Sequence, residues 1–343
     1  MKRATSFVFA DVTVQPGERV TVDLPMARLY THNAMTLPVQ VVHGRRRGPV
    51  LFVSAAVHGD EINGVEIIRR LLNSRALNSL RGTLLAIPVA NPFGFIQRAR
   101  YLPDRRDLNR SFPGTAKGSL AARLAHLFMT EIASRCDYGI DLHTGSNFRS
   151  NLPQVRIGLD DPETLELATA FGAPIVVPSE LREGSLREAV AALGKPVLVY
   201  EAGEALYFNE PAIRVGLRGI INLMRHVGML PAAHRKKHRE PVVTDRTSWV
   251  RASISGIFTR KVKLGDMVKK RSLLGVLSDP LGDDREEVRA PFSGIVIGEL
   301  KLPLAHEGDA LIHLAKVSDH DEAEEVMDEY TSSLTEEDFA LER

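Results

Sequence analysis

Residues 49–203 alternate between short, fully apolar runs and amphipathic helical patterns, and no other feature of the sequence limits the fold as strongly. Between the runs lie NGVEIIRRLLNSRAL and SLAARLAHLFMTEIASR, with apolar residues at i, i+3 and i+4, and DPETLELATAFG, which begins with a capping Asp and Pro. Fully apolar strands need cover on both faces. The pattern therefore predicts an α/β fold with three layers, α/β/α, around a mostly parallel, mixed sheet. The runs are PVLFVSAAV (49–57), GTLLAIPVA (82–90), CDYGIDL (136–142), APIVVPS (173–179) and KPVLVYEAG (195–203).

Composition divides the chain into four parts. Residues 1–233 are expected to form one α/β domain, whose first 48 residues hold antiparallel strands in RVTVDLP and TLPVQVVHG. The polar, basic stretch PAAHRKKHREP indicates a linker at 234–245. Beyond it the helical patterns stop, and 246–317 shows short strand-like runs and turns. The tail, 318–343, carries eleven acidic residues and one basic residue, and we expect it to be mobile or loosely helical.

The segment 246–317 contains an internal repeat. SGIF…KLGDMV (255–268) recurs as SGIV…HEGDAL (293–311), which predicts two similar β halves in a small barrel or sandwich. This half-repeat resembles the biotinyl/lipoyl domains, in which a modified lysine lies on the hairpin between the halves. Here the hairpin reads SDPLGDDREE and has no lysine, so we expect a structural or gating module. If it covers the active site, His306 and Glu307 are its candidates to reach it.

Charge and cysteine content narrow the class of protein. The net charge is +1 and charges of both signs are mixed along the chain, which gives no reason to expect a nucleic acid or a membrane as partner and favours a small molecule. The single cysteine, Cys136, excludes an internal disulfide and a cysteine-built zinc finger. The N-terminal MKRATSFVFADVTVQPG has too short an apolar run for a signal sequence, so a cytoplasmic protein is expected, and a homo-oligomer remains open.

Polar side chains follow several of the apolar runs. His58 and Glu61 come after the first run, His143 after the third, and Glu201 after KPVLVY. The His-x-x-Glu spacing alone is weak, since chance supplies it about once in a chain of this composition. Parallel strands, however, end at one edge of a sheet, where ligands bind. Two imidazoles and one carboxylate there match a catalytic zinc site, and a further carboxylate can serve as general base. Glu204 is the nearby alternative to Glu201.

The loop between the second and third runs is rich in arginine. Guanidinium groups suit carboxylates, so this loop predicts an anionic substrate, and Arg100 or Arg98 could stabilise an oxyanion. The loop also contains Asn109, and its arginines are Arg98, Arg100, Arg105, Arg106 and Arg110.

Five motifs in this order, His-x-x-Glu, Arg-Tyr-Leu, DLNRSFPG, DLHTGS and VYEAGE, resemble the succinylglutamate desuccinylase/aspartoacylase family, a branch of the zinc carboxypeptidase fold. The resemblance covers about residues 48–230 and extends to the appended β module. It implies one zinc ion per chain, held by His58, Glu61 and His143. It also implies that Glu201 is the general base. The residues that engage the carbonyl and the substrate carboxylate would be Arg100, Asn109 and Arg110.

These features predict a zinc-dependent amidohydrolase that removes the acyl group from an N-acyl amino acid, such as an N-succinyl or N-acetyl amino acid. Two alternatives stay open: a zinc carboxypeptidase that releases acidic C-terminal residues, and a non-catalytic binding protein on the same fold. The segment PSELREGSLREAVAALG lacks the tyrosine of true carboxypeptidases and instead carries Arg182 and Arg187. Ser146 and Ser185 lie near the motifs, but the chain has no Gly-x-Ser-x-Gly elbow, which argues against a serine hydrolase.

Overall fold

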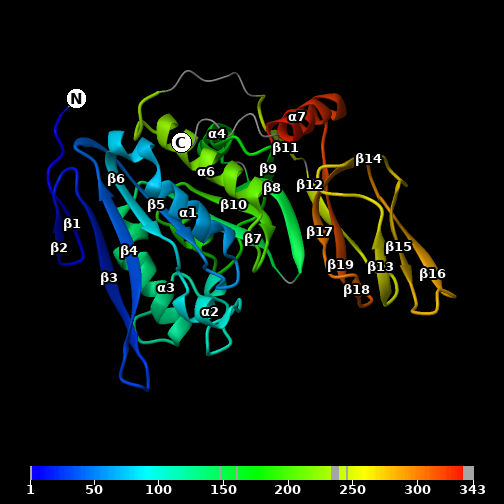
Figure 1. The fold of residues 1–343 in the computed structure, drawn as a ribbon, viewed down its shortest axis with the longest axis horizontal. Coiled ribbons are helices and arrows are strands. Elements are labelled where there is room, and N and C mark those ends of the chain that lie inside the picture. Colours follow the sequence, from blue (N-terminus) through cyan, green and yellow to red (C-terminus); the bar gives the residue numbers. More distant parts are fainter. Residues whose placement is uncertain (1, 147, 160, 233–238, 245, 335–343) are drawn as a thin grey trace.

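Four parallel strands form the centre of the fold. They are β6 (Arg81–Ile87), β5 (Arg46–Ala55), β7 (Tyr138–Gly145) and β10 (Val197–Glu204), side by side in this order. Each of them coincides with one of the predicted apolar runs, so the mixed α/β fold is confirmed. The computed structural model describes residues 2–146, 148–159, 161–232, 239–244 and 246–334 (Figure 1).

Antiparallel strands flank this centre on both sides. Next to β6 lie β4 (Ala34–His43) and β3 (Arg19–Arg28), and β1 (Phe7–Phe9) pairs with β2 (Val12–Val14) in a separate small sheet. Next to β10 lies β8 (Arg149–Ile157), which is antiparallel to β10 and parallel to β9 (Ile175–Pro178). The expectation of a mostly parallel sheet therefore holds only at the centre. Strand β8 was not predicted because RSNLPQVRI lacks a continuous apolar run.

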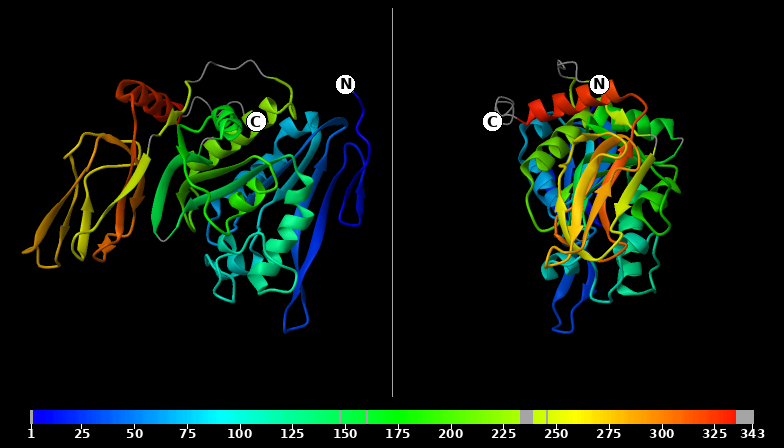
Figure 2. Two further views of the ribbon diagram at one scale, coloured as in Figure 1. Left: turned by 180° about the vertical axis from the view of Figure 1, so that it is seen from behind. Right: turned by 90° about the vertical axis from the view of Figure 1, so that its right-hand side faces the viewer.

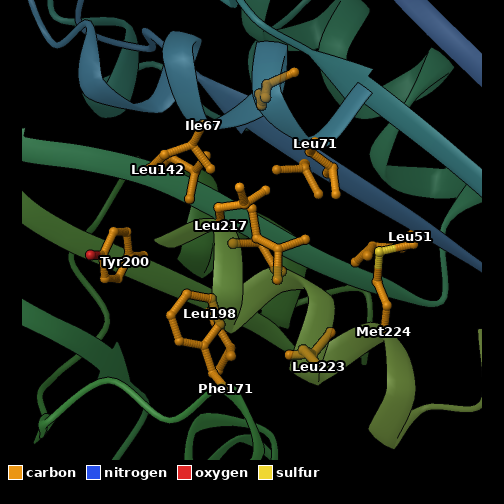
Figure 3. Packing of buried hydrophobic residues seen from close by; sticks show 14 of the residues in the cluster. Leu51, Ile67, Leu71, Leu142, Phe171, Leu198, Tyr200, Leu217, Leu223 and Met224 are labelled. Atoms are coloured by element: carbon orange, nitrogen blue, oxygen red, sulfur yellow. The ribbon is translucent and has the colours of Figure 1, made fainter. Parts of the chain in front are cut away.

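Helices cover both faces of the sheet. On one face, α1 (Asn63–Asn73), α4 (Pro162–Phe171) and α6 (Glu210–His226) pack on a core that includes Leu142 and Tyr200 (Figure 3). On the opposite face, α3 (Leu120–Glu131) and α5 (Leu186–Ala191) pack on a second core around Phe52. Successive side chains of a strand point to opposite faces. Because Leu142 faces the first core, His143 faces the side of α3 and α5. The shorter helices are α2 (Pro92–Gln97), η1 (Arg75–Ser79), η2 (Leu108–Arg110) and η3 (Ala133–Arg135).

The C-terminal strands continue the central sheet instead of forming a detached domain. Beyond β8 follow β17 (Gly294–Leu300), β19 (Ala310–Lys316) and β12 (Arg246–Arg251), so the module lies at the end of the molecule opposite to β3 (Figures 1 and 2). A second sheet packs within the module around Leu274 and Leu277. Of the predicted linker, residues 234–238 and 245 lie outside the described residues. The second sheet comprises β16 (Arg285–Arg289), β15 (Leu273–Ser278), β13 (Gly256–Arg260) and β18 (Leu304–Ala305), while β14 (Met267–Val268) pairs with β17 and β11 (Val242–Val243) with β9.

The sequence repeat corresponds to a repeated turn. Gly265 and Gly308 have φ values of +89° and +86°, a region that favours glycine. In the first turn the Asp266 carboxylate accepts a hydrogen bond from the Lys263 N–H, and in the second the Asp309 carboxylate accepts one from the His306 N–H. The Gly-Asp pairs are thus conformational signals of two equivalent turns.

Part of the acidic tail, which was expected to be mobile or loosely helical, forms a helix. Residues His320–Ser333 form helix α7, which Asp319 caps by accepting a hydrogen bond from the Glu322 N–H. Ala323, Val326 and Met327 are buried at helical spacing, and Ala323 and Met327 pack in one cluster with strand residues such as Ile297. The acid count concealed this apolar stripe, and acidic residues in the first turn favour a helix N-terminus. Residues 335–343 lie outside the described residues. Among the described helices, none combines the length and the apolar character needed to cross a bilayer.

Candidate functional site

His58, Glu61 and His143 meet at the carboxyl edge of the parallel strands. Glu61 lies between the two imidazoles: its Oε1 is 2.8 Å from His58 Nδ1, and its Oε2 is 2.8 Å from His143 Nδ1. One donor atom from each of the three residues falls within 4.8 Å of the others, and all three side chains are buried. The arrangement can hold a metal ion.

The backbone between β5 and α1 brings His58 and Glu61 together. The Glu61 N–H donates to the His58 carbonyl at 3.1 Å, which closes a tight turn. Gly59 is needed there because a Cβ at this position would come within 2.0 Å of the Gly94 backbone. Asn91, at the N-terminus of α2, holds that neighbouring segment by accepting a hydrogen bond from the Gly94 N–H. Close approach of α2 therefore explains the glycine in His-Gly-Asp-Glu.

Each imidazole is oriented by a carboxylate on its far nitrogen. Asp107 Oδ1 lies 3.1 Å from His58 Nε2, and Asp141 Oδ2 lies 2.7 Å from His143 Nε2. Ser54 Oγ in turn donates to Asp141 Oδ1 at 2.7 Å. Such partners fix the ring and the tautomer of a metal-binding histidine. Both rings are thereby set to present Nδ1 toward Glu61.

Glu61 and the two histidines stabilise one another's charged forms. Burial raises the pKa of Glu61, but the charges and hydrogen bonds of His58 and His143 outweigh burial and hold this pKa well below its usual value. For His143, burial lowers the pKa, while Asp141 and Glu61 together raise it well above the usual value. Glu61 is therefore an ionised carboxylate. Two imidazoles with one carboxylate are the protein ligands of many catalytic zinc sites.

We expect Asp141→Asn to weaken metal binding by about 10- to 100-fold, the usual effect of losing a carboxylate that orients a histidine ligand. Competition against a chromogenic chelator measures this affinity. Asp137→Asn is the matched control, because Asp137 immediately precedes the same strand and its carboxylate accepts a hydrogen bond from the Val50 N–H, away from the imidazoles. Equal affinity of the wild type and Asp141→Asn would contradict the role given to Asp141.

Glu201 lies beside His143 on the neighbouring strand. The two residues are register partners in the parallel pair β10/β7, so their side chains point to the same face of the sheet. Asn151 Nδ2 donates to Glu201 Oε2 at 2.7 Å, and Arg156 Nε lies 3.3 Å from Glu201 Oε1. Glu204, the alternative, pairs with Gly145 beyond an irregularity in the strand. The register thus places Glu201, and not Glu204, level with His143.

Of the two alternative arginines, Arg100 lies next to the triad, as we call His58, Glu61 and His143, and Arg98 does not. The Arg100 guanidinium is 3.4 Å from Glu61 Oε1 and donates to Asp107 Oδ2 at 3.0 and 3.2 Å. Arg98 is exposed and ends helix α2 in a left-handed conformation. Burial lowers the Arg100 pKa, but Glu61 and Asp107 outweigh it and raise that pKa. Arg105 and Arg106 are exposed on the same loop.

Asn109 and Arg110 follow Asp107 in the short helix η2. Asn109 Oδ1 accepts a hydrogen bond from the Leu186 N–H, and the Arg110 guanidinium donates to the Asn109 carbonyl. Partial burial of its guanidinium and the nearby positive charge of Arg182 lower the Arg110 pKa. Arg187, the other arginine noted near the site in the sequence, stabilises the end of the neighbouring strands. It donates hydrogen bonds to the Ile157 and Glu180 carbonyls and to Ser179 Oγ.

Several other predicted candidates make hydrogen bonds that stabilise helix ends or turns of the backbone. Ser185 caps α5 by accepting from the Glu188 N–H, and the Ser146 carbonyl accepts from the Arg149 N–H in a turn. His306 and Glu307 are exposed in the turn before β19, where their N–H groups bond Asp309 and Ser255.

Sequence reasoning missed three polar neighbours of the site, Asp107, Asn151 and Arg156. The sequence did contain a signal for Asp107: it begins the family motif DLNR, and a carboxylate beside several arginines can be expected to pair with one of them. Asn151 and Arg156 had none, since strand β8 itself was not predicted.

Comparison with known proteins adds a family match. A family model described as the succinylglutamate desuccinylase/aspartoacylase catalytic domain matches residues 47–227, more than half of the chain. The N-alpha-acetyl-L-2,4-diaminobutyric acid deacetylase of Halomonas elongata is 28% identical over 297 residues, which are 83% of this chain and 86% of that protein.

Solved structures agree with this match. The succinylglutamate desuccinylase/aspartoacylase of Rhodobacter sphaeroides is 26% identical, with a TM-score of 0.77 over 87% of this chain and 96% of that one. The ectoine utilization protein EutE (DoeB) of Ruegeria pomeroyi, in a product-bound structure, is 24% identical, with a TM-score of 0.79 over 87% of this chain and 95% of that one. The second likeness is one of fold.

Proposed function

Because this chain belongs to the succinylglutamate desuccinylase/aspartoacylase family, we propose that it is a zinc-dependent deacylase that hydrolyses the amide bond of an N-acyl amino acid. The activities named for its relatives identify it as a hydrolase of amide bonds. The observation that carries the finer proposal is the position of Glu201, which is in register with His143 and shares its face of the sheet. A carboxylate therefore stands next to three potential metal ligands.

His58, Glu61 and His143 would hold the zinc ion. Their donor set fits this metal: two imidazoles whose far nitrogens are held by carboxylates, and an ionised carboxylate between them. When bound, zinc supplies the Lewis acidity that makes water nucleophilic at neutral pH and polarises the scissile carbonyl.

Glu201 would accept the proton of the attacking water and deliver it to the leaving amine nitrogen. Asn151 of β8 donates a hydrogen bond to this carboxylate and would orient it, and Arg156 of the same strand lies 3.3 Å from it. Arg100 would stabilise the oxyanion. Three of its five N–H donors point to Glu61 and Asp107, which leaves two for the substrate.

Asn109 and Arg110 would bind the substrate carboxylate. Arg110 is exposed, and its charge is close to that of Arg182. Such a positive surface favours an anionic ligand, because two neighbouring guanidinium groups gain from a shared counter-ion. The substrate class that follows is a small N-acyl amino acid with a free carboxylate.

A substrate panel tests the proposal on the purified, zinc-loaded protein. It contains Nα-acetyl-2,4-diaminobutyrate, N-acetylaspartate, N-succinylglutamate and short peptides with acidic C-termini, and it measures release of the free amine. We expect hydrolysis of N-acyl amino acids that stops when a chelator removes zinc. Preferential cleavage of the peptides would replace the proposal by the carboxypeptidase alternative, and hydrolysis of nothing in the panel would reject both.

For residues 246–317 we propose a structural role, although the repeat resembles biotinyl/lipoyl carriers. The hairpin between β15 and β16, where carriers place their lysine, reads SDPLGDD. Intact-mass measurement should find no biotin or lipoate on Lys269, Lys270 or Lys301.

A further inference from the structure

A lateral row of residues links the C-terminal module to the catalytic strand. Across the sheet, Trp249 on β12 pairs with His313 on β19, His313 with Gly298 on β17, Gly298 with Asn151 on β8, and Asn151 with Gly203 on β10. Register partners point their side chains to the same face. One unbroken rung of the sheet therefore crosses from the module to the strand that carries Glu201.

An irregularity in β8 turns Asn151 toward Glu201. Glu201 pairs with Gln154 and Gly203 pairs with Asn151, so two steps along β10 correspond to three steps along β8. The extra residue is a β-bulge, which re-aims the side chains that follow it. As a result both Asn151 and Gln154 face the side of Glu201. The 2.7 Å hydrogen bond from Asn151 to Glu201 depends on this bulge.

The module packs tightly behind Asn151. A Cβ on Gly298 would lie 2.9 Å from His313 Cβ, 3.2 Å from Asn151 Oδ1 and 3.2 Å from the Trp249 ring. The His313 and Trp249 rings are stacked, with centroids 4.4 Å apart and an angle of 7° between their planes. The Arg149 guanidinium lies 5.5 Å from the centre of the Trp249 ring. A side chain at position 298 would therefore crowd Asn151, His313 and Trp249 together.

His313 contributes a neutral ring to this packing. Burial, and then the positive charge of Arg156, lower its pKa to about 3. An uncharged imidazole can stack flat on the indole without a counter-ion. The two stacked rings therefore pack rigidly beside Gly298 at neutral pH.

We propose that Asn151 is a positioning residue for Glu201 and that the C-terminal module holds it in place through Gly298, His313 and Trp249. The inference rests on the proposed function of Glu201 as general base. Asn151 thereby fixes the rotamer of the Glu201 carboxylate, and three residues of the module, Gly298, His313 and Trp249, fix Asn151.

Asn151→Ala and Asn151→Asp test the first step. Loss of a hydrogen bond to a charged group should lower kcat by about 10- to 100-fold, with KM and zinc content little changed. Asp keeps the size of Asn but cannot donate and adds a like charge, so we expect it to be at least as harmful as Ala. If Asn151 served only packing, Asp would restore activity relative to Ala, and that result would overturn the proposal.

Gly298→Ala tests the second step. The added methyl group should displace Asn151 and lower kcat by about 5-fold or more, and it should cost nothing further in an Asn151→Ala background, because both changes then act through one contact. Gly275→Ala is the matched control: its Cβ would lie 2.4 Å from the Phe258 ring inside the module, so it crowds the module core without touching Asn151. It should lower the melting temperature and keep kcat.

Crystal structures of the wild type, Asn151→Ala and Gly298→Ala separate this inference from the proposed function. We expect the Glu201 carboxylate to shift in both variants, a readout that needs no turnover. An unmoved Glu201 would reject the inference even if the enzyme is a deacylase. A shifted Glu201 in a protein that hydrolyses none of the panel substrates would support the positioning role and reject the proposed function.

Discussion

Glu201→Gln is expected to lower turnover by about 10²–10⁴-fold without loss of zinc binding, because removal of a general base, the role that we propose for Glu201, usually has an effect of this size. Gln has nearly the size of Glu but cannot accept the proton of the attacking water. Because Glu201 is the register partner of His143 and is not itself one of the three clustered ligand residues, the metal site should survive the change. Steady-state kinetics on the best panel substrate and metal analysis of the same preparation measure both quantities.

The control for this variant is Glu204→Gln on the same strand. Glu204 pairs with Gly145, past the irregularity that separates it from Glu201, and it should tolerate the change with kcat within a few-fold of the wild type. A fully active Glu201→Gln, or an inactive Glu204→Gln beside it, would move the role of base away from Glu201.

His58→Ala should abolish both metal binding and activity. Two ligands, Glu61 and His143, cannot replace the three that a catalytic zinc site uses, so the zinc content should fall from about one ion per chain to near zero. The fold should persist, because the triad lies at the edge of the sheet and both hydrophobic cores remain intact. Metal analysis after dialysis and far-UV circular dichroism measure the two effects.

His43→Ala is the control for His58→Ala. His43 is a buried histidine of the same sheet, and its two ring nitrogens lie 2.8 Å from Thr83 Oγ1 and from the Thr5 carbonyl. Its loss should lower thermal stability but leave zinc in place. A His58→Ala protein that retains zinc would refute the ligand assignment.

Sequence alone predicted the residues of the candidate triad because of a simple geometric rule. Parallel strands end at a common edge, so polar residues that follow successive apolar runs meet there. His58, His143 and Glu201 each follow such a run, and the structure brings His58, Glu61 and His143 into one cluster, with Glu201 in register beside His143.

The rest depends on pairings that the local sequence does not encode. Asn151 faces Glu201 only because β8 carries a bulge and lies antiparallel to β10, and RSNLPQVRI has no pattern that signals either. Likewise, the continuation of the sheet into the module depends on contacts between residues almost 150 positions apart, such as Asn151 with Gly298. The packing of helix α7 was not predicted for a different reason: the acidic residues suggested a mobile or loosely helical segment, and the apolar stripe among them was not recognised.

The shared strand contact between β8 and β17 also limits how this chain can be divided. Leu152, Ile175 and Val177 of the α/β domain are buried together with Ile295 and Ile297 of the module. A fragment that stops at the linker would expose this apolar surface together with an unpaired stretch of β8, and open strand edges of this kind recruit other chains into aggregates. Chimaeras between family members should therefore exchange β8, β9 and the module as one unit, even though these segments are distant along the chain.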